Sequence, residues 1–255
     1  MTDAVELSRY GDHVALLEFE NPPTNALSFD LCDRLTAELH RAEADVSIRA
    51  VVLAGRGENF SFGGDIRELQ RMEPEARGEE LARFRVLADA LERFRAPTIA
   101  VISGWCAGGA VELVLCCDVR MAAESARFLC SGVNVGLVSG ARRLTRVIGS
   151  AAAKYVLYSG SPFDAAAAAR SGLVSEVLPK DQLLHAALDY ARGVASRAPL
   201  AVEAAKRVVN ATARISSDDA RAVELDELGQ LIRSRDHHIA LDAVLDKSAP
   251  MFTRS

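Results

Sequence analysis

Glu112 and the glycines that precede it are the residues whose types and spacing best fit a chemical site. An apolar run at residues 98–102 leads into the glycine-rich stretch 104–109, and an apolar helical pattern follows as far as residue 117. This order predicts a strand, a tight loop and a helix whose first backbone N–H groups have no partner inside the helix. Glycine lets another group come close to that backbone, so an oxyanion or a polarised carbonyl can accept hydrogen bonds there.

Glu112 lies one turn into this predicted helix, between apolar neighbours. A carboxyl group in such surroundings is expected to be buried, and burial raises its pKa toward the range in which it exchanges protons near neutral pH. Two plainer interpretations stay open: the glycines serve only close packing, or the acidic side chain only complements the helix dipole. Residues 97–117 are also apolar enough to be compared with a membrane span, but Glu112 and the glycines interrupt the run.

A second unit with the same order of elements lies earlier in the chain. The apolar run at residues 50–54 is followed by a loop with several glycines, residues 55–65, and a helical pattern resumes at Ile66. Two such units predict a parallel sheet whose loops emerge on one side, where each loop can offer a backbone N–H to the same oxygen atom. Neither is a nucleotide-binding loop, because no G-x-G-x-x-G follows a strand and no Gly-Lys-Ser/Thr is present.

The composition is that of a soluble globular protein. The 255 residues are 49% hydrophobic and 25% charged, with a net charge of −5, which does not favour binding to nucleic acid. The first residues lack the basic-then-apolar layout of a signal peptide. The five cysteines form neither a CxxC pair nor a Cys/His cluster with metal-ligand spacing, so we expect no metal site and reduced thiols in a cytoplasmic protein.

The remaining pattern divides the chain into an α/β core and a helical end. Further strands are predicted at residues 14–19, 119–122 and 173–178, and further helices after the N-cap Ser28 and at 81–95, 149–159 and 165–171. The polar residues 70–80 are expected to form a mobile surface segment, and residues 128–139 to line the cavity of the glycine loops. After residue 180 only helices are predicted, at 181–196, 199–212, 217–234 and 236–247. We therefore expect a core at residues 1–195 and a helical oligomerisation subdomain at 196–255.

Six segments resemble, in order and spacing, the crotonase (enoyl-CoA hydratase/isomerase) superfamily over nearly the whole chain. They are residues 23–27, 60–66, 104–113, 117–120, 169–174 and 246–252. The resemblance implies an α/β fold, a crotonase-like spiral of ββα turns followed by a C-terminal helical trimerisation region. It also implies a homotrimer or a dimer of trimers, an acyl-CoA thioester as substrate, and no cofactor beyond that coenzyme A.

The resemblance assigns roles to particular residues. The backbone N–H groups of Gly64 and Gly109 would grip the thioester oxygen, and Glu112 would act as the acid/base. The residues it assigns to binding of coenzyme A are Asn25, Ala26, Phe62, Asp65, Ile66 and Lys247. For Lys247, a solvated position at the end of a helix is an equally good interpretation.

The chain departs from the family pattern at Gly132, which is expected to line the substrate site. Ordinary hydratases carry a second glutamate, which falls on this glycine, and glycine cannot transfer a proton. The loop that follows, residues 139–144, is also shorter than the usual pattern, so we expect a reshaped pocket. Arg142 and Arg143 can meet a carboxylated acyl group or face solvent or another subunit, and the second interpretation is favoured.

Three functions remain open. In the leading one, Glu112 adds water to, or removes it from, an α,β-unsaturated acyl-CoA. The second keeps the oxyanion hole but isomerises a double bond, decarboxylates, or cleaves a C–C bond. The third is a non-catalytic acyl-CoA-binding protein, for which Gly132→Glu changes nothing except a possible gain of hydratase activity.

Overall fold

The computed structural model describes residues 4–255, which fold around a six-stranded sheet. β1 pairs antiparallel with β2, and the other neighbours in the order β1-β2-β3-β4-β6-β9 are parallel. The strands are β1 (Ala4–Tyr10), β2 (Val14–Glu20), β3 (Ala50–Gly55), β4 (Thr98–Ile102), β6 (Val119–Ala123) and β9 (Glu176–Leu178). β3 and β4 are almost wholly buried, because helices cover both faces of the sheet.

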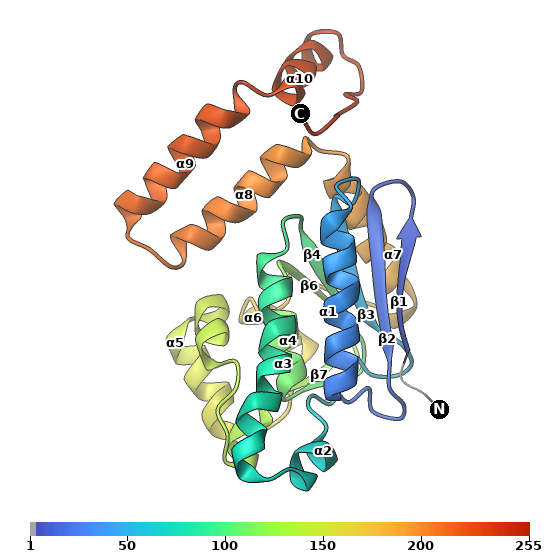
Figure 1. Cartoon of the computed structure of the whole chain (residues 1–255), viewed down its shortest axis with the longest axis vertical. Helices are drawn as coiled ribbons and strands as arrows, with labels where there is room; N and C mark the ends of the chain where they lie inside the picture. Colours follow the sequence, from blue (N-terminus) through green and yellow to red (C-terminus); the bar gives the residue numbers. More distant parts are fainter. Residues whose placement is uncertain (1–3) are drawn as a thin grey trace.

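Alternate residues of the central strands point to opposite faces of the sheet. Val51 and Leu53 of β3 belong to the larger buried cluster, which includes side chains of α1 (Phe29–Ala44), α3 (Pro74–Arg93) and α4 (Gly109–Leu115). Val52 and Ala54 belong to a second cluster with α7 (Lys180–Ala195). Figure 1 shows α1 and α3 side by side on one face and α7 on the other.

A small second sheet brings the two glycine loops together. It consists of β5 (Trp105–Ala107), β7 (Arg127–Leu129) and β8 (Phe163–Asp164), and it starts directly after β4. The loop after β3 lies along β5, where the Phe60 N–H donates to the Ser103 carbonyl and the Ala107 N–H donates to the Ser61 carbonyl. A side chain at Gly104 would collide with that loop, since a Cβ there would lie 2.2 Å from the Glu58 carbonyl oxygen.

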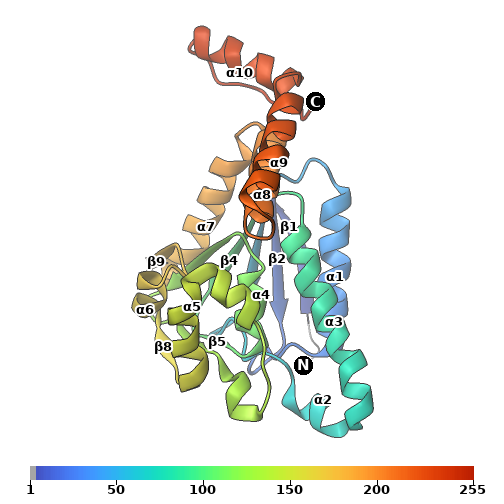
Figure 2. The ribbon, with the colours of Figure 1, turned by 90° about the vertical axis from the view of Figure 1, so that its left-hand side faces the viewer.

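Helices form the rest of the chain. Around the small sheet lie α2 (Ile66–Arg71), the short 3₁₀ helix η1 (Ser131–Val135), α5 (Ala141–Ser159) and α6 (Ala165–Arg170). The chain ends with α8 (Pro199–Thr212), α9 (Ser217–Leu231) and α10 (Arg235–Leu245), and this predicted helical C-terminal region is confirmed. Figures 1 and 2 show α8 and α9 paired and projecting, with α10, beyond the sheet. Large apolar side chains are exposed there, including Leu225, Leu228, Ile232 and Val244.

Three local features differ from the predictions. Residues 74–80, for which no helix was predicted, are helical, because Pro74 occupies the first turn of α3, where its missing N–H has no consequence. α5 begins at Ala141 and bends at Gly149, whose φ is +77°, so the predicted start at residue 149 marks only its second half. β1 was not predicted. In the described part of the chain, no helix has the length and hydropathy needed to cross a bilayer.

Candidate active site

The two glycine loops meet at Gly63, Gly64 and Gly109. A Cβ on Gly63 would lie 2.8 Å from the Gly109 nitrogen, and a Cβ on Gly109 would lie 3.6 Å from the Gly64 nitrogen. Gly63 has a φ of +87°, so glycine is required there for both its conformation and the close approach. Within residues 4–255, neither the Gly64 N–H nor the Gly109 N–H donates to a protein acceptor. The loops thus present two adjacent, unpaired donors.

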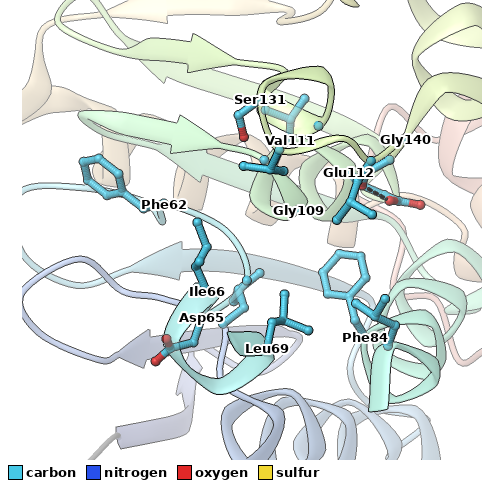
Figure 3. A pocket seen from close by; sticks show the side chains of 18 of the residues that line it. Phe62, Asp65, Ile66, Leu69, Phe84, Gly109, Val111, Glu112, Ser131 and Gly140 are labelled. Carbon is cyan, nitrogen blue, oxygen red and sulfur yellow. Dashed lines mark hydrogen bonds between the residues drawn. The ribbon is translucent and has the colours of Figure 1, made fainter. Parts of the chain in front are cut away.

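These donors border a cavity of about 160 Å³ with largely apolar walls. Its apolar lining comes from Leu27, Phe29, Leu69, Leu81, Phe84, Val111, Leu115, Val135, Leu137 and Leu144. Figure 3 shows Phe62 and Ile66 at one end, Gly109 between, and Glu112, Gly140 and Phe84 at the other end. A pocket of this kind, apolar with a few placed polar groups, is typical of a binding site for an organic ligand.

Glu112 is the carboxylate at the inner end of this pocket. Its Oε1 accepts a hydrogen bond from Arg143 Nη1 at 2.7 Å, and its Oε2 accepts one from Ser139 Oγ at 2.6 Å. Its side chain is 18% exposed, so the predicted burial is only partial, and its charge is balanced by an ion pair. Gly140, with a φ of +67°, lets the backbone pack against Glu112, since a Cβ there would lie 3.3 Å from the Glu112 Cβ.

Arg143 is buried, so the interpretation that it faces solvent or another subunit is wrong. Besides Glu112, its guanidinium contacts Glu92 at 2.8 and 3.0 Å and Asp89 at 3.0 Å. Burial alone would raise the pKa of Glu92, but hydrogen bonds from Arg143, and then from Arg214 and Arg146, lower it to about 2. Glu92 is therefore an anion at neutral pH and holds Arg143 against Glu112.

Gly132 lines the pocket, but the space beside it is filled. A Cβ at this position would lie 2.8 Å from the Leu137 carbonyl oxygen and 3.5 Å from the Ser139 nitrogen. The loop from η1 to α5 therefore occupies the place where a side chain at residue 132 would begin. The same loop supplies Ser139, which contacts Glu112 directly, and leads into Arg143. Neither contact was predicted, although both residues lie in the segment that departs from the family pattern.

Three of the residues assigned to coenzyme A line the outer end of the pocket. Phe62 and Ile66 are exposed, and the Phe62 ring lies 5.8 Å from the ring of Trp105. Asp65 caps α2, because its Oδ1 accepts from the N–H groups of Arg67 and Glu68.

The other three do not line the pocket. The buried Asn25 side chain ties its loop to the loop after β3, since it donates to the Arg56 and Asn59 carbonyls and accepts from the Asn21 N–H. Ala26 accepts from the Asn21 side chain. Lys247 comes two residues after the end of α10. Figure 1 shows α10 at the opposite end of the molecule from α2, because the C-terminal helices project away from the sheet.

Two cysteines also line the pocket, and neither is a reactive thiolate. Burial raises the pKa of Cys32 to about 12 and that of Cys130 to about 11, so both thiols keep their protons near neutral pH. No group of side chains among the described residues has the composition of a metal site. The carboxylates in the pocket lining are Glu112 and Asp65, and Asp65 is engaged in capping α2.

Known proteins are similar to this chain in sequence and in fold. The sequence model described as enoyl-CoA hydratase/isomerase matches residues 9–255. The chain belongs to the enoyl-CoA hydratase/isomerase family. A 2,3-dehydroadipyl-CoA hydratase from Escherichia coli (strain K12) is 34% identical over 243 residues, which cover 94% of each chain. A short-chain-enoyl-CoA hydratase from Clostridium acetobutylicum is 31% identical over 92% of each chain.

Solved structures of this family confirm the predicted crotonase-like fold. The crystal structure of an enoyl-CoA hydratase from Bacillus anthracis superposes with a TM-score of 0.96 at 29% identity, over 98% of this chain and 99% of that one. Family membership makes the protein an enzyme of the acyl-CoA-processing type.

Proposed function

We propose that the protein adds water to the double bond of a 2-enoyl-CoA thioester, with Glu112 as its acid/base. The observation that supports this most is the position of the Glu112 carboxylate in the same apolar pocket as the unpaired N–H groups of Gly64 and Gly109. The hydratase names of the E. coli and C. acetobutylicum relatives agree with this reaction.

In the proposed reaction, the thioester oxygen accepts hydrogen bonds from Gly64 and Gly109. A water held by Glu112 gives its proton to the carboxylate, and its oxygen forms a bond to the β-carbon. The electron pair of the double bond moves onto the thioester oxygen as an enolate, where each N–H donor typically contributes about 2.7–4 kcal/mol to lowering the barrier. Glu112 then returns the proton to the α-carbon, and a 3-hydroxyacyl-CoA results.

Ser139 and Arg143 position Glu112 for this cycle. Each holds one carboxylate oxygen, at 2.6 and 2.7 Å, and each oxygen keeps a further lone-pair direction for the water. One carboxylate then serves as both base and acid, so the reaction has no need of a second acid at Gly132. The only coenzyme involved is the CoA of the substrate.

The single carboxylate also favours a second candidate reaction, the isomerisation of a 3-enoyl-CoA. One group can remove a proton from the α-carbon and return it to the γ-carbon, without water. Incubation of a 3-enoyl-CoA and of crotonyl-CoA with the enzyme separates the two reactions, because isomerisation yields the conjugated thioester and hydration consumes it.

Hydration of crotonyl-CoA by the wild type and by Glu112→Ala tests the proposal. Loss of a general acid/base is expected to lower kcat by about 10²–10⁴-fold. Glu124→Ala, which removes an exposed carboxylate from a turn after β6, serves as the control and is expected to keep the wild-type rate. Equal rates for Glu112→Ala and the wild type would rule out hydration through Glu112, and so would an inactive wild type.

We also propose that the protein assembles as a homotrimer or a dimer of trimers through residues 196–255. The exposed apolar side chains of α9 and α10 support this, because patches of this kind are typical of protein–protein contacts. Light scattering during size-exclusion chromatography measures the mass directly, and a monomer at micromolar concentration would contradict it.

A further inference from the structure

A second cavity, of about 680 Å³, adjoins the pocket at Glu112. The residues that line both cavities are Leu81, Phe84, Glu112, Leu137, Ser139 and Gly140. The outer end of the pocket, with Phe62 and Ile66, lies on the other side of Gly109 in Figure 3. With the thioester at Gly64 and Gly109, as proposed above, the shared walls offer the acyl chain a path past Glu112 into the second cavity.

Positive charge is in excess in this second cavity. Its arginines are Arg85, Arg93, Arg142, Arg143 and Arg214, and its carboxylates are Asp89, Glu92 and Glu112. The acyl pocket, by contrast, has largely apolar walls and no arginine in its lining. The change from apolar to cationic lining occurs at Glu112.

Ion pairs within the protein do not neutralise all of the positive charge in this cavity. Arg143 and Arg214 bind Glu92 at 2.8 and 2.7 Å. Arg142 approaches Glu92 only to 3.9 Å, and its side chain is 64% exposed. Arg85 and Arg93 form no ion pair with any residue in the described part of the chain. Three guanidinium groups thus remain available to an anion that enters from the acyl pocket.

We propose that the preferred substrate carries a second carboxylate, at the end of its acyl chain far from the thioester, and that Arg142, assisted by Arg85, binds it. The methylene groups between the two ends pack against Leu81, Phe84 and Leu137. The inference rests on the proposed function, because that function places the thioester at Gly64 and Gly109. Because the Arg142 and Arg85 side chains are exposed to solvent, the preference is electrostatic and sensitive to salt.

Steady-state kinetics with two matched substrates test the inference. The substrates are 2-hexenoyl-CoA and its analogue in which a carboxylate replaces the terminal methyl group. We expect kcat/KM to favour the carboxylate substrate about tenfold or more at low salt, and Arg142→Gln to reduce that ratio about fivefold. Lys154→Gln, on the same helix but outside both cavities, removes an equal charge and is expected to leave the ratio unchanged. A wild-type ratio of one or less overturns the inference, and so does an unchanged ratio in Arg142→Gln.

Binding of the saturated thioesters separates this inference from the proposed function, because they have no double bond to hydrate. Calorimetry gives Kd for hexanoyl-CoA and for its analogue that ends in a carboxylate. Tighter binding of the carboxylate thioester, with that advantage reduced in Arg142→Gln, supports the inference. If the same enzyme shows no hydration, only the proposed function is overturned. Equal affinities overturn the inference and leave hydration untouched, and no binding of either thioester overturns both.

Discussion

Arg143→Met is expected to destabilise the folded protein through Glu92. The buried Glu92 carboxylate accepts hydrogen bonds from Arg143, Arg146 and Arg214. Its pKa of about 2, in place of the ordinary 4.5, corresponds to about 3 kcal/mol of stabilisation at neutral pH. Arg143 makes two of these bonds and also pairs with Glu112, and removal of one member of a buried ion pair typically costs about 3–5 kcal/mol.

We therefore expect Arg143→Met to lose about 3 kcal/mol and to lower Tm by about 6–12 °C for a chain of this size. Thermal and urea unfolding at pH 7 measure both quantities. Arg127→Met serves as the control, because that guanidinium is exposed and donates to the backbone carbonyls of Ser125 and Ala126. Arg143→Met is also expected to hydrate crotonyl-CoA about tenfold more slowly or worse, because Glu112 loses one of its two partners.

A double-mutant cycle with Glu92→Gln isolates the contact. We expect the two substitutions to be coupled by about 2 kcal/mol, and additive effects within about 0.5 kcal/mol would refute the reasoning. The pH dependence provides a second check. Since the pKa of Glu92 is lowered in the folded protein, its stabilisation is complete above about 4.5 and is lost as the pH falls toward 2. Glu92→Gln is expected to lack that part of the acid destabilisation.

Three further predictions concern the pocket. Gly109→Pro removes one N–H at a helix position that tolerates proline. It is expected to lower kcat/KM by about 10²–10³-fold relative to Gly109→Ala, which keeps the donor. Equal rates for the two variants would contradict a role of the Gly109 N–H in binding the thioester oxygen. Gly132→Glu is expected to cost about 1–3 kcal/mol of folding stability, because its Cβ would lie 2.8 Å from the Leu137 carbonyl oxygen. No gain in hydration rate is expected, and a faster enzyme would show that the loop between η1 and α5 moves to admit the new side chain. Alkylation of Cys130 by iodoacetamide, followed by mass spectrometry, is expected to be slow at pH 8 and to accelerate toward pH 11, and fast labelling at pH 8 would contradict a buried thiol.

The sequence was most informative where short-range rules decide the structure. The apolar runs before residues 55 and 103 predicted two parallel strands, and the glycines after them predicted loops that meet at one edge. Ser28 was predicted as an N-cap, and its hydroxyl accepts from the Leu31 N–H. These features depend on neighbours in the chain, so pattern and turn chemistry are sufficient to predict them.

Long-range pairing was the part that no local pattern revealed. Arg143 meets Glu112 from 31 residues away and Glu92 from 51 residues away, and only the packing of α4 against α3 and α5 brings the three together. In the sequence, two adjacent arginines in a predicted loop are typical of a solvated surface. No helix was predicted at residues 74–80 for a different reason: proline breaks a helix interior but suits a first turn, where Pro74 stands in α3.

The most direct measurement of the central claim compares turnover with binding in Glu112→Gln. The amide has nearly the shape of the carboxylate. Its oxygen can still accept from Arg143 and its NH2 group can donate to the Ser139 hydroxyl, so the pocket is expected to keep its form. We predict a Kd for the unreactive butyryl-CoA within about threefold of the wild type, with kcat for hydration of crotonyl-CoA about 10²–10⁴-fold lower. A variant that binds butyryl-CoA normally and hydrates crotonyl-CoA at the wild-type rate would contradict Glu112 as the acid/base of this enzyme.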